Sequence, residues 1–238
     1  MEEQTGLEGV KEKARRFLHL TREDENVIDI AFATYVGNKL GGDPLWICIV
    51  GPPASGKTEI ISSMDGYGSV FLLSSLTPNT FISGKELTSP NARNPSLLPL
   101  LGGKTLLLIK DLTTIIMKHK DSKAEIFSQL REIYDGRFVK AFGTGKTEDW
   151  KGKFGILAGV TSVIDREFAL NSLLGERFLY FRMHTRDHTN AARMALEHAE
   201  GIDAYRKNLQ HEVWQFLTWL DANVHTHNVT IGADFEQC

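Results

Sequence analysis

Residues 45–58, Leu45-Trp46-Ile47-Cys48-Ile49-Val50-Gly51-Pro52-Pro53-Ala54-Ser55-Gly56-Lys57-Thr58, join an apolar run to a G-x-x-x-x-G-K-T loop. The apolar run predicts a buried strand, and the residues after Gly56 predict a helix. A loop in this position binds phosphate groups, because its backbone N–H groups converge on the anion and the helix dipole favours negative charge. Lys57 is expected to contact the β- and γ-phosphates of a nucleoside triphosphate, and the Thr58 hydroxyl to bind Mg²⁺.

The whole loop and the residue after it are candidates for nucleotide contact: Gly51, Pro52, Pro53, Ala54, Ser55, Gly56, Lys57, Thr58 and Glu59. Pro52 and Pro53 have no N–H group, so the donating amides are expected from Ala54 through Thr58. Gly51 and Gly56 permit backbone angles and a close approach that a side chain would block. The expected ligands are ATP and Mg²⁺.

Composition limits the class of protein. The chain has 238 residues, 42% of them hydrophobic and 24% charged, which suits one large domain or a core with a small helical appendage. A net charge of −3 means that any nucleic-acid contact must come from a local patch. The two cysteines form no disulfide framework, and neither a membrane span nor a signal peptide is apparent, so we expect a cytoplasmic protein without membrane contact.

Apolar runs alternate with helical patterns along the chain, which predicts a parallel α/β sheet with its ligands at the carboxyl ends of the strands. The expected strands are 45–50, 70–73, 105–111, 154–160 and 178–181, and the expected core helices are 57–64, 121–134 and 164–174. Residues 138–151 read as an inserted β-hairpin. We expect three parts: an N-terminal helix and linker (1–24), a nucleotide-binding core (25–186) and a lid-like tail (187–238) with helices over 188–200 and 202–223.

Two further residues stand at the carboxyl ends of predicted strands, which is the edge of the sheet where the loop is also expected. Asp111 is expected to hold the Mg²⁺, although a strand-end Asp can also simply cap the next element. Thr161 is expected near the γ-phosphate or the attacking water, the alternative again being a local cap. Leu112 occupies the place where many ATPases carry a catalytic Glu, so hydrolysis is expected to be slow or to depend on another residue; Thr113 and Thr114 can orient water.

Arg177 precedes the last predicted strand. An arginine here can project from the subunit edge toward a neighbour's γ-phosphate and stabilise the charge that develops during transfer. The alternative is a surface ion pair with Glu176 or Asp165.

The predicted hairpin carries positive charge interleaved with aromatic residues, namely Lys140, Lys146 and Lys151 with Phe142 and Trp150. Such a mixture suits contact with a nucleic-acid backbone, and the alternative is a solvated hairpin whose aromatic residues belong to the core. Gly143-Thr144-Gly145-Lys146-Thr147 lacks the first glycine and the following helix of a phosphate loop, so we read it as the hairpin tip.

Taken together, residues 25–224 resemble the AAA+ ATPases, with Gly51–Thr58 as Walker A, Leu106–Asp111 as Walker B, Thr161 as sensor 1 and Arg177 as arginine finger. The segments 42–46, 109–114, 129–136 and 174–178 are similar to uncharacterised AAA+ ATPases of bacteriophages and bacterial mobile elements, of the helicase-like branch. The resemblance implies a P-loop αβα sandwich, ATP and Mg²⁺, a homo-oligomeric ring such as a hexamer in which Arg177 acts in trans, and work on DNA in a bacterial or phage-infected cell. The chain departs from the AAA+ pattern in three ways: it lacks the Glu after Asp111, it has Thr in place of the commoner Asn at sensor 1, and it has no assignable sensor 2.

The preferred hypothesis is therefore an ATP-hydrolysing helicase-like motor or loader in phage or mobile-element replication. One alternative is a non-motor ATP switch that recruits a DNA-processing partner. Another is a protein-remodelling ATPase that grips polypeptide with Phe81 and Ile82 in a central pore; the plainer reading places these two residues in the core.

Overall fold

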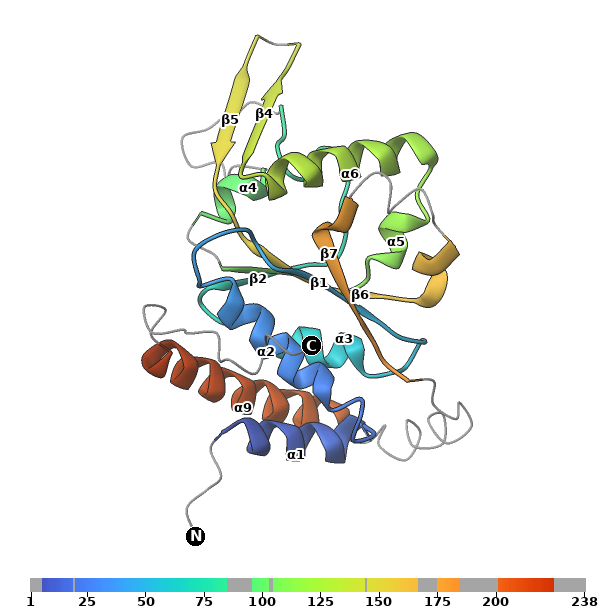
Figure 1. Ribbon diagram of the computed structural model, residues 1–238, viewed down its shortest axis with the longest axis vertical. Coiled ribbons are helices and arrows are strands. Elements are labelled where there is room, and N and C mark those ends of the chain that lie inside the picture. The colour runs from blue at the N-terminus through green and yellow to red at the C-terminus, as the bar shows by residue number, and fades with distance from the viewer. Residues whose placement is uncertain are drawn as a thin grey trace, which may run out of the picture.

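The computed structural model describes residues 6–18, 20–84, 96–102, 105–143, 145–166, 175–184 and 201–224. At its centre lies a five-stranded sheet of order β2-β3-β6-β1-β7 (Figure 1). Every neighbouring pair in it is parallel. The strands are β1 (Trp46–Val50), β2 (Val70–Leu73), β3 (Leu106–Ile109), β6 (Gly155–Val160) and β7 (Phe178–Arg182). The α/β class with a parallel sheet, predicted from the alternating pattern, is confirmed.

Helices cover both faces of the sheet (Figure 1). One face carries α1 (Leu7–Leu18), α2 (Asn26–Gly37), α3 (Lys57–Ser63) and α9 (Ile202–Asn223). The other carries α4 (Leu97–Leu100), α5 (Thr113–Ile116) and α6 (Lys120–Tyr134). This double cover explains why β1, β3 and β6 read as continuous apolar runs, since each of their residues is buried.

Alternate side chains of β1 enter two different cores, as the pleat of a strand requires. Ile47 and Ile49 pack with the helices of the α3 side. Trp46, Cys48 and Val50 pack with those of the α6 side. The strand leads into residues 51–58, which we call the phosphate loop after their sequence motif. It is held on both faces, which fixes the point where this loop begins.

The inserted hairpin is present as β4 (Arg137–Ala141) paired antiparallel with β5 (Thr147–Lys151). It projects beyond the sheet next to the end of α6 (Figure 1).

The predicted tail helix over 202–223 corresponds to α9, whereas the one over 188–200 and the boundary at 186 lie outside the described residues. Of the predicted helix 164–174, the described part belongs to a short 3₁₀ segment, Ser162–Arg166. No helix in the described part of the chain is long and apolar enough to span a bilayer.

The C-terminal helix is fixed to the α/β core near its end by a polar cluster around Asp221. Its carboxylate accepts hydrogen bonds from the hydroxyls of Tyr35 and Tyr67, each at 2.8 Å, and pairs with Lys39. Tyr35 is also bonded to Ser69 at 2.7 Å. Because these partners come from α2, from the turn after α2 and from the chain that follows α3, α9 belongs to the same packed unit as the sheet.

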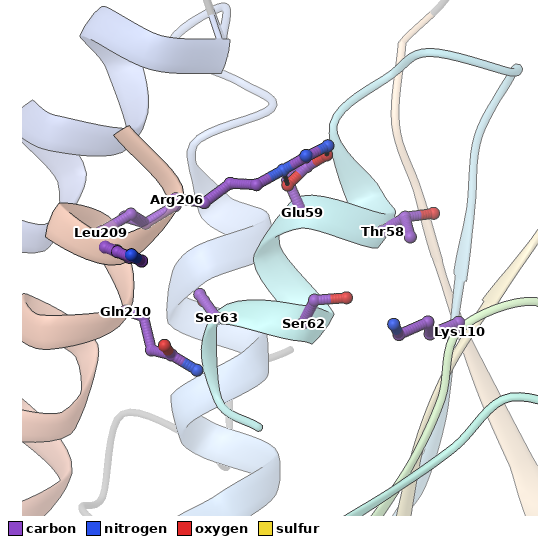
Figure 2. A pocket seen from close by; sticks show the side chains of 9 residues that line it. Thr58, Glu59, Ser62, Ser63, Lys110, Arg206, Leu209 and Gln210 are labelled. Carbon is purple, nitrogen blue, oxygen red and sulfur yellow. Dashed lines mark hydrogen bonds and ion pairs between the residues drawn. The ribbon is translucent and has the colours of Figure 1, made fainter. Parts of the chain in front are cut away.

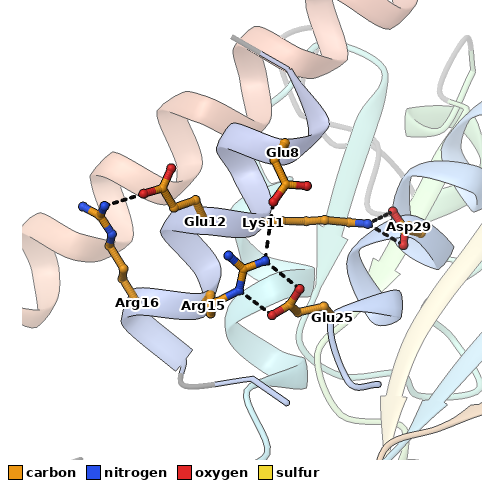
Figure 3. A network of polar contacts seen from close by, with 7 residues as sticks. All are labelled: Glu8, Lys11, Glu12, Arg15, Arg16, Glu25 and Asp29. Atoms are coloured by element: carbon orange, nitrogen blue, oxygen red, sulfur yellow. Dashed lines mark hydrogen bonds and ion pairs between the residues drawn. The ribbon is translucent and has the colours of Figure 1, made fainter. Parts of the chain in front are cut away.

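The N-terminal helix is tied to α2 by charged side chains (Figure 3). Arg15 donates two hydrogen bonds to Glu25, at 2.5 and 2.8 Å, and Lys11 pairs with Asp29 at 2.7 Å. Beneath these pairs Val10 packs in the apolar core of the α3 side. The segment 1–24, which we expected to be a helix and linker, therefore contributes to the core through its described part.

This network predicts a specific dependence of stability on pH. The Arg15 guanidinium holds the pKa of the Glu25 carboxyl below its ordinary value of 4.5. A depressed pKa in the folded state adds stability above the unfolded value, and this stability is lost as the pH falls through the folded pKa. We expect Glu25→Gln to lower the melting temperature at neutral pH and to leave a smaller difference from the wild type at acid pH, as measured by thermal unfolding from pH 7 to 3.

Glu12→Gln is the matched control, because Glu12 pairs only with the exposed Arg16 in the described network and such pairs contribute little. An equal melting-temperature difference between the wild type and Glu25→Gln at both ends of the pH range would contradict the prediction.

Candidate functional site

Three predicted site positions meet at the carboxyl edge of the sheet. Val50, the last residue of β1, is in register with Val160 of β6, and the Gly51 N–H donates to the Val160 carbonyl at 3.0 Å. Thr161 therefore lies beside the start of the phosphate loop. On the other side of β6, β3 ends just before Asp111. The sheet order thus brings Gly51, Asp111 and Thr161 to one edge, as the sequence predicted.

The phosphate loop has an unusual backbone. Gly56 has φ +87°, and Ala54, at φ +60°, is the one non-glycine residue with positive φ in the described part of the chain. Such angles are strained for an L-residue and occur where a functional geometry requires them. Gly51 is also needed, because a Cβ there would lie 2.8 Å from the Ser55 Oγ. The Ser55 Oγ is buried and makes no hydrogen bond to any described residue. The loop is therefore compact and contains an unsatisfied polar atom, which fits a site that takes a polar ligand.

Lys57 points back into the loop. Its Nζ donates to the Pro52 carbonyl at 2.8 Å, and the residue is only 7% exposed. Burial lowers the pKa of Lys57, while the negative charge of Asp111 acts in the opposite direction. The two side chains are therefore close enough to interact electrostatically, and a bound anion would compensate the charge of a poorly solvated lysine.

Asp111 is positioned by its own turn. Its Oδ1 accepts the Thr113 N–H at 2.9 Å, and its carbonyl accepts the Thr114 hydroxyl at 3.0 Å. Thr58, the other expected metal ligand, is exposed at the start of α3. Within the described residues no three His, Cys, Asp or Glu side chains are grouped as a metal site. One carboxylate and one hydroxyl suit Mg²⁺, which usually binds through one or two protein ligands, substrate phosphates and water.

The structure also connects Thr113 with Thr161. The Thr113 Oγ1 accepts the Thr161 N–H at 3.1 Å and lies 3.3 Å from the Thr161 Oγ1. Leu112 between Asp111 and Thr113 is 2% exposed and packs in the core of the α6 side. The residue that follows Asp111 therefore contributes no polar group, and two linked hydroxyls take its place at this edge.

Glu59, expected to contact the nucleotide, pairs with the C-terminal helix in this structure. Arg206 of α9 donates to both of its carboxylate oxygens, at 2.6 and 3.0 Å (Figure 2). Sequence reasoning missed Arg206, because a separation of 147 residues leaves no local pattern that would connect it to the loop.

Arg177 lies at the opposite end of the sheet from the phosphate loop. The next residue, Phe178, is in register with Trp46 at the start of β1, a whole strand length from Gly51. The Arg177 guanidinium pairs with Asp135 at 2.9 Å and lies over the Tyr134 ring at 5.3 Å. The side-chain ion pair weighed in the sequence analysis is thus present, but its partner is Asp135. Arg177 is therefore a strand length away from the phosphate loop of its own chain.

The hairpin lysines have different surroundings. Lys146 pairs with Glu148 at 2.5 Å, and Lys140 lies 3.6 Å from Glu125 and donates to the Pro78 carbonyl. Lys151 is exposed and has no ion pair within the described residues. The positive charge of the hairpin is therefore partly neutralised by its own neighbours. Arg137 adds a further pair with Asp149, at 2.9 Å.

Phe81 and Ile82 do not line a surface. They are 0% and 2% exposed and pack in the core of the α6 side with residues such as Leu98. The expectation that they grip polypeptide in a pore is wrong for this conformation. The alternative, that both residues belong to the core, is confirmed. A short apolar stretch in a loop gives no sign of which outcome applies, because burial depends on the residues that fold over it.

Compared with known proteins, the chain matches no family model and no curated protein. Its candidate site therefore depends on the geometry described above.

Proposed function

We propose that this protein binds and hydrolyses ATP with Mg²⁺ and is an ATPase of the AAA+ type. The observation that carries the proposal is the meeting of the phosphate loop, Asp111 and Thr161 at one edge of the sheet, with the Asp111 charge acting on Lys57. The placement of β6 between β1 and β3 agrees with the resemblance, in which sensor 1 ends the strand beside the loop.

Each side chain has a definite task in this proposal. Lys57 exchanges its bond to the Pro52 carbonyl for the β- and γ-phosphates, and the loop amides donate to the same oxygens. Thr58 and Asp111 hold Mg²⁺, which neutralises charge that develops on the phosphates. The linked hydroxyls of Thr113 and Thr161 orient the attacking water, since they are the polar groups that replace the usual carboxylate.

Replacing Asp111 tests the metal role. We expect Asp111→Asn to lower Mg²⁺-dependent ATP turnover by about 100-fold, because a metal ion supplies several kcal/mol of transition-state stabilisation. Binding of ATP without Mg²⁺ is expected to change little. Turnover is measured by phosphate release and binding by calorimetry with and without EDTA. Wild-type turnover in Asp111→Asn would remove Asp111 from the metal site.

We also propose that the protein assembles into a homo-oligomeric ring and acts on DNA, with the hairpin as the contact. The projection of β4 and β5 from the sheet and the exposed Lys151 support this part. The ion pairs of Lys140 and Lys146 argue that these residues contribute to DNA binding only after exchanging partners.

Salt dependence of single-stranded DNA binding tests the hairpin. We expect Lys140→Ala and Lys146→Ala each to weaken DNA binding and to reduce the slope of log affinity against log salt by about one. Lys118→Ala, which changes a lysine in the segment just after α5, is the control. Unchanged DNA affinity in both variants and in Lys151→Ala would exclude the hairpin as the contact.

A non-motor ATP switch that recruits a DNA-processing partner is the second candidate, because the buried Leu112 leaves no carboxylate beside Asp111 to activate water. Tight ATP binding with negligible turnover in the assembled oligomer would favour the switch over the motor.

A further inference from the structure

A polar hollow lies next to the proposed nucleotide site. It has a volume of about 420 Å³ and spreads over the outward side of α3, between α9 and the end of β3 (Figure 2). Thr58 and Ser62, one turn apart on α3, face Lys110, whose side chain extends toward them. From the other side α9 contributes Arg206 and Lys207. The size is ordinary for a small-ligand site.

The charge of this pocket is positive. Glu59 is its only carboxylate, and both Glu59 oxygens are taken by Arg206. Lys110 and Lys207 make no side-chain hydrogen bond or ion pair with any described residue, and the same holds for the hydroxyls of Thr58 and Ser62. Two cations and two hydroxyl donors thus line one hollow without partners in the described structure.

These donors suit an oxyanion that has several acceptor oxygens and about two negative charges. Phosphate has both properties, and hydrolysis of ATP produces it beside Thr58. In that reaction a bond forms between the water oxygen and the γ-phosphorus. The bond between the γ-phosphorus and the bridging oxygen breaks, that oxygen stays with ADP, and a proton is released to solvent. Thr58 lines the pocket and belongs to the phosphate loop, so the two sites adjoin.

We propose that the pocket formed by Thr58, Ser62, Lys110 and Lys207 binds inorganic phosphate and receives the phosphate released from ATP. The pocket's role in the reaction rests on the proposed ATPase function, whereas its affinity for phosphate does not. Lys110 and Lys207 provide the charge, and the two hydroxyls donate hydrogen bonds.

Titration of inorganic phosphate by calorimetry, with and without Mg·ADP, tests the proposal on the whole chain. We expect the Lys110→Gln/Lys207→Gln double variant to bind phosphate at least about tenfold more weakly than the wild type, since each substitution replaces a charge-assisted hydrogen bond to the anion by a weaker neutral one. Lys118→Gln is the matched control and is expected to bind phosphate like the wild type. Melting temperatures check that all variants are folded.

The same titration on Lys57→Ala separates this proposal from the ATPase proposal. Phosphate binding that persists in Lys57→Ala and is lost on adding the Lys110 and Lys207 substitutions would support the pocket, even if the wild type hydrolysed no ATP. Equal phosphate affinity in the wild type and the double variant would overturn the proposal, as would the absence of phosphate binding to the wild type. If the Lys110→Gln/Lys207→Gln variant lost single-stranded DNA binding and kept its phosphate binding, the proposal would also be overturned, and the pocket would be assigned to nucleic acid.

Discussion

Lys57→Ala is expected to lower ATP affinity by at least about 100-fold, because Lys57 is assigned two charged hydrogen bonds to the phosphates and each contributes about 1.5–3 kcal/mol. ATP turnover is expected to fall to the background rate. The measurement is calorimetric titration of Mg·ATP, together with phosphate release at saturating nucleotide.

The fold is not expected to depend on this lysine. Lys57 is buried with a lowered pKa, and its bond within the described structure is to a loop carbonyl, so its removal takes a poorly solvated charge out of the protein. A melting temperature equal to or above that of the wild type would show that lost binding is a local effect. ATP affinity within a few-fold of the wild type would remove the phosphate loop from the proposed function.

Arg177→Ala is expected to reduce ATP turnover by about 1,000-fold in the assembled protein while leaving ATP binding nearly unchanged. This is the lower end of the effect of an arginine supplied in trans to a phosphoryl-transfer site. In the proposed ring Arg177 acts on a neighbour, because it lies at the amino end of β7, a strand length from its own loop. Turnover is measured at protein concentrations above and below the assembly threshold, with sedimentation to follow the oligomer.

Asp135→Asn provides the matched control for Arg177. Both substitutions remove the Arg177–Asp135 pair, but Asp135→Asn leaves the guanidinium in place. We expect Asp135→Asn to retain or increase turnover, since Arg177 no longer has to leave a carboxylate to reach a neighbouring phosphate. An equal loss of turnover in the two variants would assign the effect to the local ion pair, and wild-type turnover in Arg177→Ala would reject the shared site.

Much of the site prediction rested on short stretches of sequence. The run 45–50 followed by the loop predicted a buried strand, a loop and a helix, and all three are present. Asp111 and Thr161 were placed at strand ends from apolar runs alone, and parallel pairing then brought them to one edge. Such predictions succeed because a phosphate loop and a buried parallel strand are each encoded by neighbouring residues.

Other expectations depended on which distant residues meet. Phe81 and Ile82 were candidates for a pore but lie in the core. Glu59 was expected at the nucleotide and pairs with Arg206, and the Arg177 pair has Asp135 as its partner. In each case the residue types permit several surroundings, and packing selects one of them.

The sequence by itself determined the phosphate loop, the strand before it, the parallel α/β class and the strand-end positions of Asp111 and Thr161, because these follow from periodicity and backbone chemistry over short stretches. Only the tertiary structure decided that α9 lies beside α3 and that Arg177 is a strand length from its own loop. Contacts such as Arg206 with Glu59, 147 residues apart, form when α3 and α9 bury their apolar side chains in the same core, and no local pattern specifies them.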